Sequence, residues 1–199
     1  MKEIIVASKN KGKIKEYEDF FNQFNIKCYS LYDLDEAYPD VEETGKTFQE
    51  NAIIKAEAAA KYFNKPVIAD DSGLGIDALD GKPGIETARF AGPDKDDEAN
   101  MDKVLRLMKD VPESNRTARF VAALAIKIPE ADLIVREGIC EGKIAKEKRG
   151  TEGFGYDPIF IPEGFDITIA ELPLEVKNKI SHRSHAFEQL EVYLQQTKK

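Results

Sequence analysis

Strand-like and helical patterns alternate up to residue 69, and this alternation limits the possible folds more than any other feature. Short apolar, β-branched runs at residues 4–7, 26–31 and 67–69 are typical of buried strands. The segments between them, residues 13–24 and 47–63, have helical periodicity. Because a strand–helix–strand–helix–strand order is typical of α/β proteins, we expect a fold of that class.

The later part of the chain adds long strands to this pattern. Two β-like runs, at residues 117–128 and 133–145, are separated by a short breaker segment and resemble a hairpin, which predicts a mixed sheet. Helical patterns at residues 96–109 and 184–196 complete the expected elements. We expect the long strands to project as a second lobe, so residues 1–199 would form one two-lobed domain with a central ligand cleft.

Composition narrows the class of protein. The chain has 199 residues with 42% hydrophobic and 33% charged residues, as expected of a folded soluble domain. Its net charge of −8 argues against a nucleic-acid-binding surface but leaves room for a local phosphate pocket. No apolar run approaches membrane-spanning length, and Cys28 and Cys140 lack metal-site spacing. These features predict a cytoplasmic protein without a membrane or nucleic-acid partner.

Two adjacent acids follow the apolar run at residues 67–69. Asp70 and Asp71 would point in different directions at a strand's end, and Gly73 would let the chain turn there. Such a carboxylate pair is a typical place to hold Mg²⁺ or to activate a water molecule. The alternative is an Asx-turn with solvated acids, which is the usual arrangement of acids at a strand's end.

Lysines surround a second motif, residues 8–13, which joins the first expected strand to the first helix. Backbone N–H groups at a helix start with a nearby lysine suit phosphate binding. The segment is not a Walker A loop, since the leading glycine is missing and Ile14 follows Lys13. A solvated loop remains the alternative.

The expected helix at residues 47–63 carries Asn51 and Lys55 four residues apart, so they share one helix face. Together they could hold a phosphate or orient a carboxylate. A simple ion pair of Lys55 with Glu50, or a solvated Lys55, is the alternative. Thr47 and Glu50 have the spacing of a capping box at the start of this helix.

Glycines and aromatic residues gather at residues 150–158. Phe154 or Tyr156 could stack on a base, and Asp157 could accept hydrogen bonds from the edge of that base. A glycine-rich turn with aromatic side chains filling the interior is the alternative.

A basic cluster precedes the last expected helix, which Ser181 or Ser184 could cap. Lys177, His182 and Arg183 make most sense there if an anion or a purine carbonyl is the partner. A solvated basic surface is the alternative.

Two common kinds of catalytic site find little support. The chain has no Gly-x-Ser-x-Gly motif for acyl transfer, and its two histidines and two cysteines are badly spaced for zinc. The remaining carboxylates, lysines, stacking loop and cationic helix start together indicate Mg²⁺-assisted attack on a nucleotide polyphosphate.

Taken together, these motifs resemble the inosine/xanthosine triphosphate pyrophosphatase family, also called the non-canonical purine NTP pyrophosphatases. The resemblance runs nearly end to end and is carried by seven ordered motifs: residues 8–13, 42–45, 50–52 with Lys55, 69–73, 83–84 with Ala88 and Arg89, 154–158, and 181–183. One departure is visible, because Ser8 and Lys9 stand where many members have threonine and glycine.

The resemblance implies an elongated mixed sheet between two lobes, a homodimer, and Mg²⁺-dependent hydrolysis of ITP, dITP and XTP to the monophosphate and pyrophosphate. It implies Asp71 as general base and metal ligand, Glu42 as second metal ligand, and Asp70 and Glu43 as supporting or alternate ligands. Lys55 would act at the triphosphate, and the implied substrate-binding residues are Ser8, Lys9, Asn10, Lys11, Gly12, Lys13, Ser72, Phe154, Gly155, Tyr156, Asp157, Lys177, His182 and Arg183.

Two other functions remain open at this point. A Maf-type nucleotide pyrophosphatase has a related fold but acts on other nucleotides, and the motifs at 154–157 and 181–183 argue against it. A non-catalytic nucleotide-binding module would bind ITP without releasing pyrophosphate, which the intact acids Asp70, Asp71 and Glu42 make less favoured.

Overall fold

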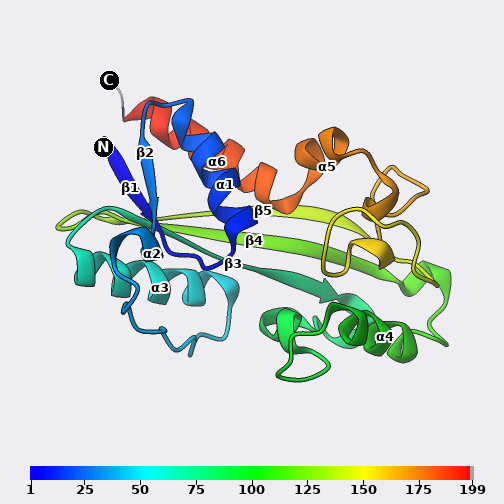
Figure 1. Cartoon of the computed structure of the whole chain (residues 1–199). Coiled ribbons are helices and arrows are strands. Elements are labelled where there is room, and N and C mark those ends of the chain that lie inside the picture. Colours follow the sequence, from blue (N-terminus) through cyan, green and yellow to red (C-terminus); the bar gives the residue numbers. More distant parts are fainter. Residues whose placement is uncertain (198–199) are drawn as a thin grey trace. The chain divides into compact units, whose positions relative to one another are not determined.

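The computed structural model describes residues 1–197, apart from the side chain of Tyr32. Within this part, six strands form one sheet in the order β2-β1-β3-β4-β5-β6 (Figure 1). β1 pairs in parallel with β2 and β3, and β5 pairs antiparallel with β6, so the predicted mixed α/β sheet is confirmed. The strands are β1 (Glu3–Val6), β2 (Lys27–Ser30), β3 (Val67–Ile76), β4 (Thr117–Lys127), β5 (Leu133–Ile144) and β6 (Phe160–Pro162).

The chain divides into two compact units, each built from separate segments. Unit 1 contains residues 1–71, 123–137 and the described residues from 186 onward, and unit 2 contains residues 72–122 and 138–185. The single two-lobed domain over residues 1–199 and its central cleft stay predictions, and residues 198–199 lie outside the described residues.

Unit 1 has helices on both faces of its strands. Helix α3 (Phe48–Phe63) lies on one face, and α1 (Lys11–Asn22) with most of α6 (His182–Gln196) lies on the other (Figure 1). Phe187 of α6 stacks on Phe20 of α1, with ring centroids 4.6 Å apart. On the opposite face, buried alanines let α3 approach the strands closely, because they add no more than a methyl group to the contact: Ala52, Ala56, Ala69, Ala123 and Ala125.

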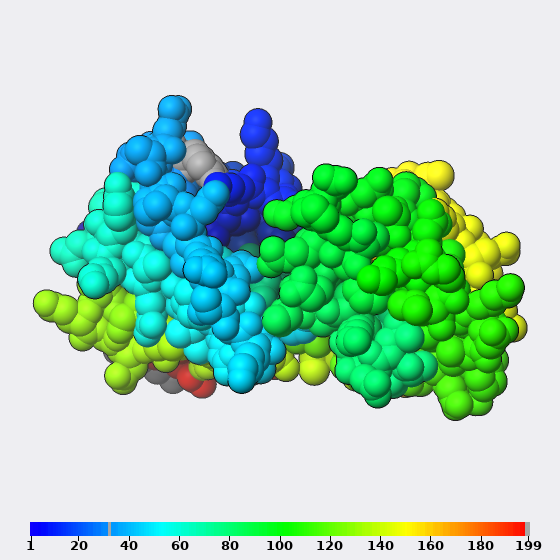
Figure 2. Space-filling view, turned by 90° about the horizontal axis from the view of Figure 1, so that it is seen from below, coloured from blue at the N-terminus to red at the C-terminus, as the bar shows by residue number. Residues whose placement is uncertain are grey.

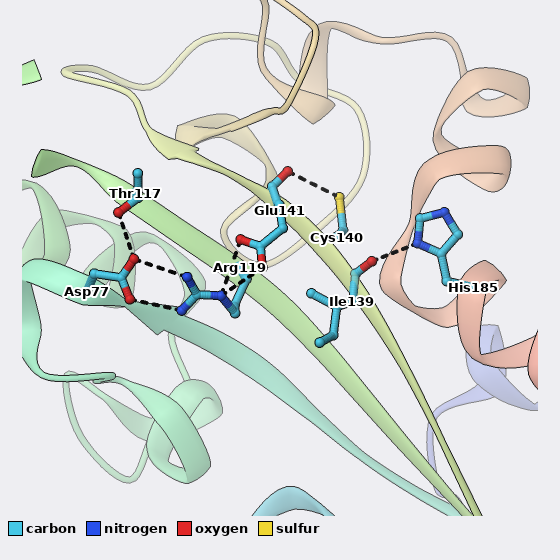
Figure 3. A network of polar contacts seen from close by, with 7 residues as sticks. All are labelled: Asp77, Thr117, Arg119, Ile139, Cys140, Glu141 and His185. Carbon is cyan, nitrogen blue, oxygen red and sulfur yellow. Dashed lines mark hydrogen bonds and ion pairs between the residues drawn. The ribbon is translucent and has the colours of Figure 1, made fainter. Parts of the chain in front are cut away.

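Unit 2 packs α4 (Asp97–Leu107) and α5 (Leu174–Ile180) around the remaining strand segments. On the sheet surface, Arg119 of β4 binds Asp77 through both Nη atoms, at 2.9 and 3.0 Å, and Glu141 of β5 through Nε at 3.0 Å (Figure 3). The hydroxyl of Thr117 also donates to Asp77, at 2.6 Å. His185 places Nδ1 2.7 Å from the carbonyl oxygen of Ile139.

The expected turn at Gly73 is wrong. β3 runs without a break from Val67 to Ile76, so the two acids lie within a strand and not at its end. In the sheet order β3 lies between β1 and β4, so neighbouring backbone is available on both sides. The alternation of side chains predicted for the two acids holds, because Asp70 is buried while Asp71 is partly exposed.

Helix boundaries differ from the prediction where side-chain caps decide them. Helix α1 begins at Lys11, because the Asn10 side chain accepts a hydrogen bond from the Lys13 N–H at 3.1 Å. Thr47 caps α3 as predicted, but the carboxylate of Glu50 accepts from the Lys46 N–H instead of closing a capping box. Ser181 caps α6 by accepting from the Ser184 N–H, one of the two predicted options.

Among the described residues, the sequence patterns did not predict several short elements, including helix α2 (Leu31–Leu34), helix α5 and strand β6. Both cysteines are free thiols, and burial raises the pKa of Cys28 to about 12 and that of Cys140 to about 11, as expected of inert side chains. No helix in the described part of the chain combines the length and apolar character that crossing a membrane requires.

Candidate active site

Asp70 is held by a lysine from the first helix of unit 1. Its side chain is only 3% exposed, and its Oδ2 lies 2.9 Å from Nζ of Lys13 in the first turn of α1. A buried carboxylate is costly unless it is paired, so Lys13 supplies the charge that Asp70 needs. The Asn10 cap places Lys13 in that first turn, since it makes the helix begin two residues before Lys13.

Lys55 lies among three carboxylates. Its Nζ is 2.8 Å from Oε1 of Glu43, and it also interacts electrostatically with Asp70 and Asp71. Burial lowers the pKa of Lys55, but the three acids together outweigh burial, so this pKa is raised and the ammonium stays charged. The sequence alternative, a pair with Glu50, is not what the structure has: Lys55 binds Glu43, and Glu50 binds the backbone of Lys46.

Burial strongly perturbs the carboxyl group of Asp71. Burial raises the pKa of Asp71 from 3.8 to about 6, and the negative charges of Glu43 and Asp70 act in the same direction. Lys55 and a hydrogen bond from the side chain of Asn51 act in the opposite direction. A carboxyl group that titrates close to neutral pH suits proton abstraction.

The other two predicted acids of the site, Glu42 and Glu43, lie in the segment before α3. Residues 38–45 form neither helix nor strand, and Figure 2 shows this stretch, in light blue, on the surface. Glu42 and Glu43 are exposed here, with Glu43 directed to Lys55. The segment is anchored to α3 at Gly45, whose N–H donates to Oδ1 of Asn51 at 2.8 Å.

The lysine-rich segment at residues 8–13 is organised around its own helix start. Ser8 accepts a hydrogen bond from the Asn10 N–H at 3.1 Å, and exposed Lys9 pairs with Asp40. Lys11 and Gly12, expected in a loop, lie in the first turn of α1. Because the first N–H groups of a helix have no intrahelical acceptor, this turn has the donors that an anion needs.

A second group of predicted residues lies in unit 2, around Asp157. This buried carboxylate accepts from Nζ of Lys177 at 2.7 Å and from the Phe154 N–H at 3.1 Å. Lys177 also lies 4.6 Å from the ring centroid of Phe154, which is 57% exposed. The group therefore presents an accessible aromatic face beside a fixed cation.

Tyr156 and Gly155 hold this group to the rest of unit 2. Tyr156 is buried and its hydroxyl donates to the carbonyl oxygen of Thr87 at 2.6 Å, while the Gly155 N–H donates to Asp97 at 3.1 Å. Of the two aromatic residues proposed for stacking, Phe154 is thus the accessible one.

The two basic residues at the start of α6 are placed differently from each other. His182 stacks on Phe120, with ring centroids 5.1 Å apart, and Arg183 is buried. Lys177 lies in α5, a helix that the sequence patterns did not indicate.

The predicted residues are thus divided between the two units, and half-buried Ser72 follows Asp71 in β3. The sequence-based site missed two residues that organise the second group, since Thr87 and Asp97 hold the segment around Tyr156. Asn51, which the sequence singled out by its spacing of four residues from Lys55, contacts Asp71 and Gly45.

The carboxylates of unit 1 supply oxygen donors of the kind that a divalent metal ion needs. Among the described residues, no group of three or more His, Cys, Asp or Glu side chains is arranged to hold a metal ion. Mg²⁺ is usually bound by one or two carboxylates, with waters and substrate phosphates completing its coordination. Asp71 with the carboxylates of residues 42–43 has the oxygen chemistry that such an ion prefers.

Comparisons with known proteins agree on one family. The family description that matches is the Ham1 family, over residues 4–193. A "dITP/XTP pyrophosphatase" of Oceanobacillus iheyensis is 56% identical over 194 residues, covering 98% of each chain. One of Bacillus subtilis is 51% identical over 195 residues, also covering 98% of each chain.

Solved structures show the same likeness. A Ham1 protein of Staphylococcus aureus has a TM-score of 0.92 and 45% identity, covering 98% of this chain and 100% of that one. A dITP/XTP pyrophosphatase of Mycobacterium abscessus has a TM-score of 0.82 and 42% identity, covering 94% and 97%.

Proposed function

The chain belongs to the Ham1 family, and from this membership and the acid–lysine cluster of unit 1 we propose that it is a nucleoside triphosphate pyrophosphatase. It hydrolyses the non-canonical purine nucleotides ITP, dITP and XTP to the monophosphate and pyrophosphate. In a cell, this reaction removes deaminated purines from the nucleotide pool. Relatives named dITP/XTP pyrophosphatase, more than 50% identical over nearly the whole chain, support this substrate class.

The observation that carries the proposal is the unequal environment of the two adjacent acids. Asp70 is buried and neutralised by Lys13, whereas Asp71 is partly exposed and has a pKa raised to about 6. Asp70 thereby supports the cluster, and Asp71 is the general base that takes the proton of the attacking water.

The lysines and the first turn of α1 receive the triphosphate. Lys55 is fully charged at neutral pH, since its pKa is raised, and it compensates negative charge on the phosphates. The N–H groups at the start of α1 supply further anion donors, with Ser8, Lys9, Asn10, Lys11, Gly12 and Lys13 around them and Ser72 adjacent to Asp71.

Asp71 and Glu42 would hold Mg²⁺, with Glu43 as an alternate ligand. Bound there, the ion would polarise the phosphates and offset their charge. The half-buried position of Asp71 and the exposure of Glu42 suit a metal site that substrate phosphates complete.

The group around Asp157 reads the base. Phe154 offers a ring for stacking, and Lys177, with His182 and Arg183, offers donors to the purine O6. Donors at this position accept inosine and xanthine, whereas the amino group of adenine would face another donor and be left unpaired. Gly155, Tyr156 and Asp157 keep the ring and the cation in place.

The proposal also includes a homodimer in the cytoplasm. The family resemblance supports the dimer, and the two free thiols suit a reducing compartment. Light scattering on the purified protein would give twice the mass of one chain for a dimer and the mass of one chain for a monomer.

A pyrophosphate-release assay tests the function. We expect turnover of ITP, dITP and XTP with Mg²⁺, at least about 100-fold slower turnover of ATP, GTP and dTTP, and none after chelation. Asp71→Asn should lower kcat by about 1000-fold or more while ITP still binds, because the base is lost but the phosphate donors remain. Asp132→Asn, at an exposed position of unit 1, is the matched control.

The outcomes separate the alternatives. Rapid turnover of ATP or GTP would contradict the proposed role, and preference for dTTP would favour a Maf-type enzyme. Binding of ITP without any pyrophosphate release would indicate a non-catalytic module. Full activity of Asp71→Asn would contradict only the assignment of Asp71 as the general base.

A further inference from the structure

One amide side chain connects the two parts of unit 1 that carry its acids. Asn51 is 2% exposed and lies in the first turns of α3. Its Oδ1 accepts from the Gly45 N–H at 2.8 Å, and its side chain donates to the carboxylate of Asp71. Asn51 therefore contacts both the exposed acidic segment and β3.

The chemistry of the partners determines which way the amide faces. The Gly45 N–H needs an acceptor, and a carboxylate needs a donor, so Oδ1 must face the loop and Nδ2 must face Asp71. In the reversed orientation, Nδ2 would face the Gly45 N–H, and Oδ1 would face the carboxylate of Asp71. This amide thus offers a donor in a defined direction, and a buried polar group in that position is costly to leave unpaired.

The approach of the loop to Asn51 allows little adjustment. A Cβ atom on Gly45 would lie 2.5 Å from Oδ1 of Asn51 and 2.9 Å from its backbone nitrogen. Only glycine permits this approach without displacement. One turn further along α3, Lys55 binds Glu43 of the same segment, so α3 holds the segment at two points.

From this geometry we propose that Asn51 is a positioning residue, which orients the Asp71 carboxylate and fixes residues 42–45 relative to it. The proposal deepens the proposed function and rests on it, since Asp71 is taken as the base. Neither ITP nor its phosphates need touch Asn51. Its loss should therefore slow the chemical step far more than it weakens nucleotide binding.

Two substitutions separate the donor from the acceptor of this amide. Asn51→Asp keeps an oxygen for the Gly45 N–H but loses the donor to Asp71, whereas Asn51→Leu loses both. We expect kcat for ITP to fall about 100-fold in each variant. The Kd of a non-hydrolysable α,β-methylene analogue of ITP, measured by calorimetry, should stay within about threefold.

The Gly45 N–H provides a readout that is independent of activity. Its hydrogen exchange, followed by NMR, should stay slow in Asn51→Asp and become fast in Asn51→Leu, because only the first retains an acceptor.

Asn100 of α4 is the matched structural control. It is 1% exposed, accepts from the Ala91 N–H at 2.7 Å and donates to the Ala88 carbonyl at 2.9 Å, so both of these partners are backbone groups. Asn100→Asp should lower Tm about as much as Asn51→Asp does, while kcat of the folded protein stays within about threefold.

The result that would overturn the proposal is a folded Asn51→Asp enzyme with kcat within threefold of the wild type. Parallel losses of kcat, binding and Tm in the Asn51 and Asn100 variants would overturn it as well, since they indicate a structural role only.

If the Asn51 variants do not fold, Gly45→Ala is the deciding variant. Its Cβ displaces a chemically intact Asn51, so it should lower kcat without weakening nucleotide binding. A wild-type enzyme that releases no pyrophosphate from ITP would overturn the proposed function itself. If the wild-type enzyme is active but the Asn51 variants do not show the expected loss of kcat, only this inference is overturned.

Discussion

Asp71 and Asp70 are neighbours in one strand, yet their surroundings assign them different properties. Asp70 faces Lys13 and is almost fully buried, so its charge is compensated within the protein. Asp71 faces Lys55, Asn51 and Glu43 with partial exposure, and burial gives it a pKa of about 6. The alternation of side chains along a strand is the cause, because it directs adjacent residues to opposite sides.

The raised pKa of Asp71 predicts a pH-dependent stability in the metal-free protein. Because the folded-state pKa lies above the ordinary 3.8, stability from this group is complete below about pH 4 and is lost as the pH rises through about 6. The Asp71→Asn variant has no titrating carboxyl group at this position. The difference between its free energy of unfolding and that of the wild type should therefore increase from about pH 4 to about pH 6, by at most about 3 kcal/mol.

Urea unfolding in a chelating buffer, followed by circular dichroism from pH 4 to 8, measures this difference. The exposed Asp132→Asn should show no such trend. A difference between Asp71→Asn and wild type that stays constant or decreases with pH would contradict the assigned environment of Asp71.

At the scale of elements, buried polar side chains hold the ends of helices and strands. Arg116, just before β4, is 2% exposed and donates to the backbone carbonyls of four residues. Nε binds the carbonyl oxygen of Ile144 at 2.8 Å, and Nη1 binds that of Met108, at the end of α4, at 2.7 Å. It also reaches the carbonyl oxygens of Val111 and Ala145, at 3.2 and 2.9 Å. One guanidinium thus joins the C-terminal end of α4 to the end of β5.

Arg116→Met should destabilise the protein by about 3 kcal/mol or more, because it leaves several buried carbonyls without their donors. Thermal or urea unfolding measures the loss. Arg106→Met, at an exposed position of α4, should change stability by no more than about 0.5 kcal/mol. A loss below about 1 kcal/mol for Arg116→Met would show that water satisfies these carbonyls.

At the scale of the whole molecule, the course of the chain couples its two units. The unit boundaries fall after residues 71, 122, 137 and 185, so β3, β4 and β5 each contribute residues to both units. A strand that loses its backbone partners in one unit cannot keep regular pairing at its continuation in the other.

We therefore predict that the protein unfolds in a single cooperative transition. In calorimetry, the ratio of the calorimetric to the van't Hoff enthalpy should be close to one, calculated per folded molecule. Circular dichroism and tyrosine fluorescence should give the same midpoint. Two resolved transitions would contradict this prediction and would mean that one unit folds without the other.

Most elements were predictable from local patterns, and the exceptions have identifiable physical causes. Strands β1, β4 and β5 and helices α3 and α4 follow apolar periodicity and caps such as Thr47 and Asp96. β3 continues to Ile76, whereas the strand was predicted to end at residue 69, because two acids, a serine and a glycine are locally typical of a turn. Its position in the middle of the sheet order outweighs that preference, and no local pattern carries this information.

The sequence contains the residue types that form the candidate site, but it does not show which of these side chains pair with one another. Local sequence was enough to indicate acids, lysines and a glycine-rich aromatic segment, and with them a nucleotide polyphosphate as substrate. Pairing depends on contacts between residues far apart in the chain, so only the folded structure joins Lys13 to Asp70, Lys55 to Glu43 and Lys177 to Asp157. The same long-range packing gives Asp71 its raised pKa and makes Asn51 its partner, because burial and hydrogen bonding arise only when α3 lies against β3.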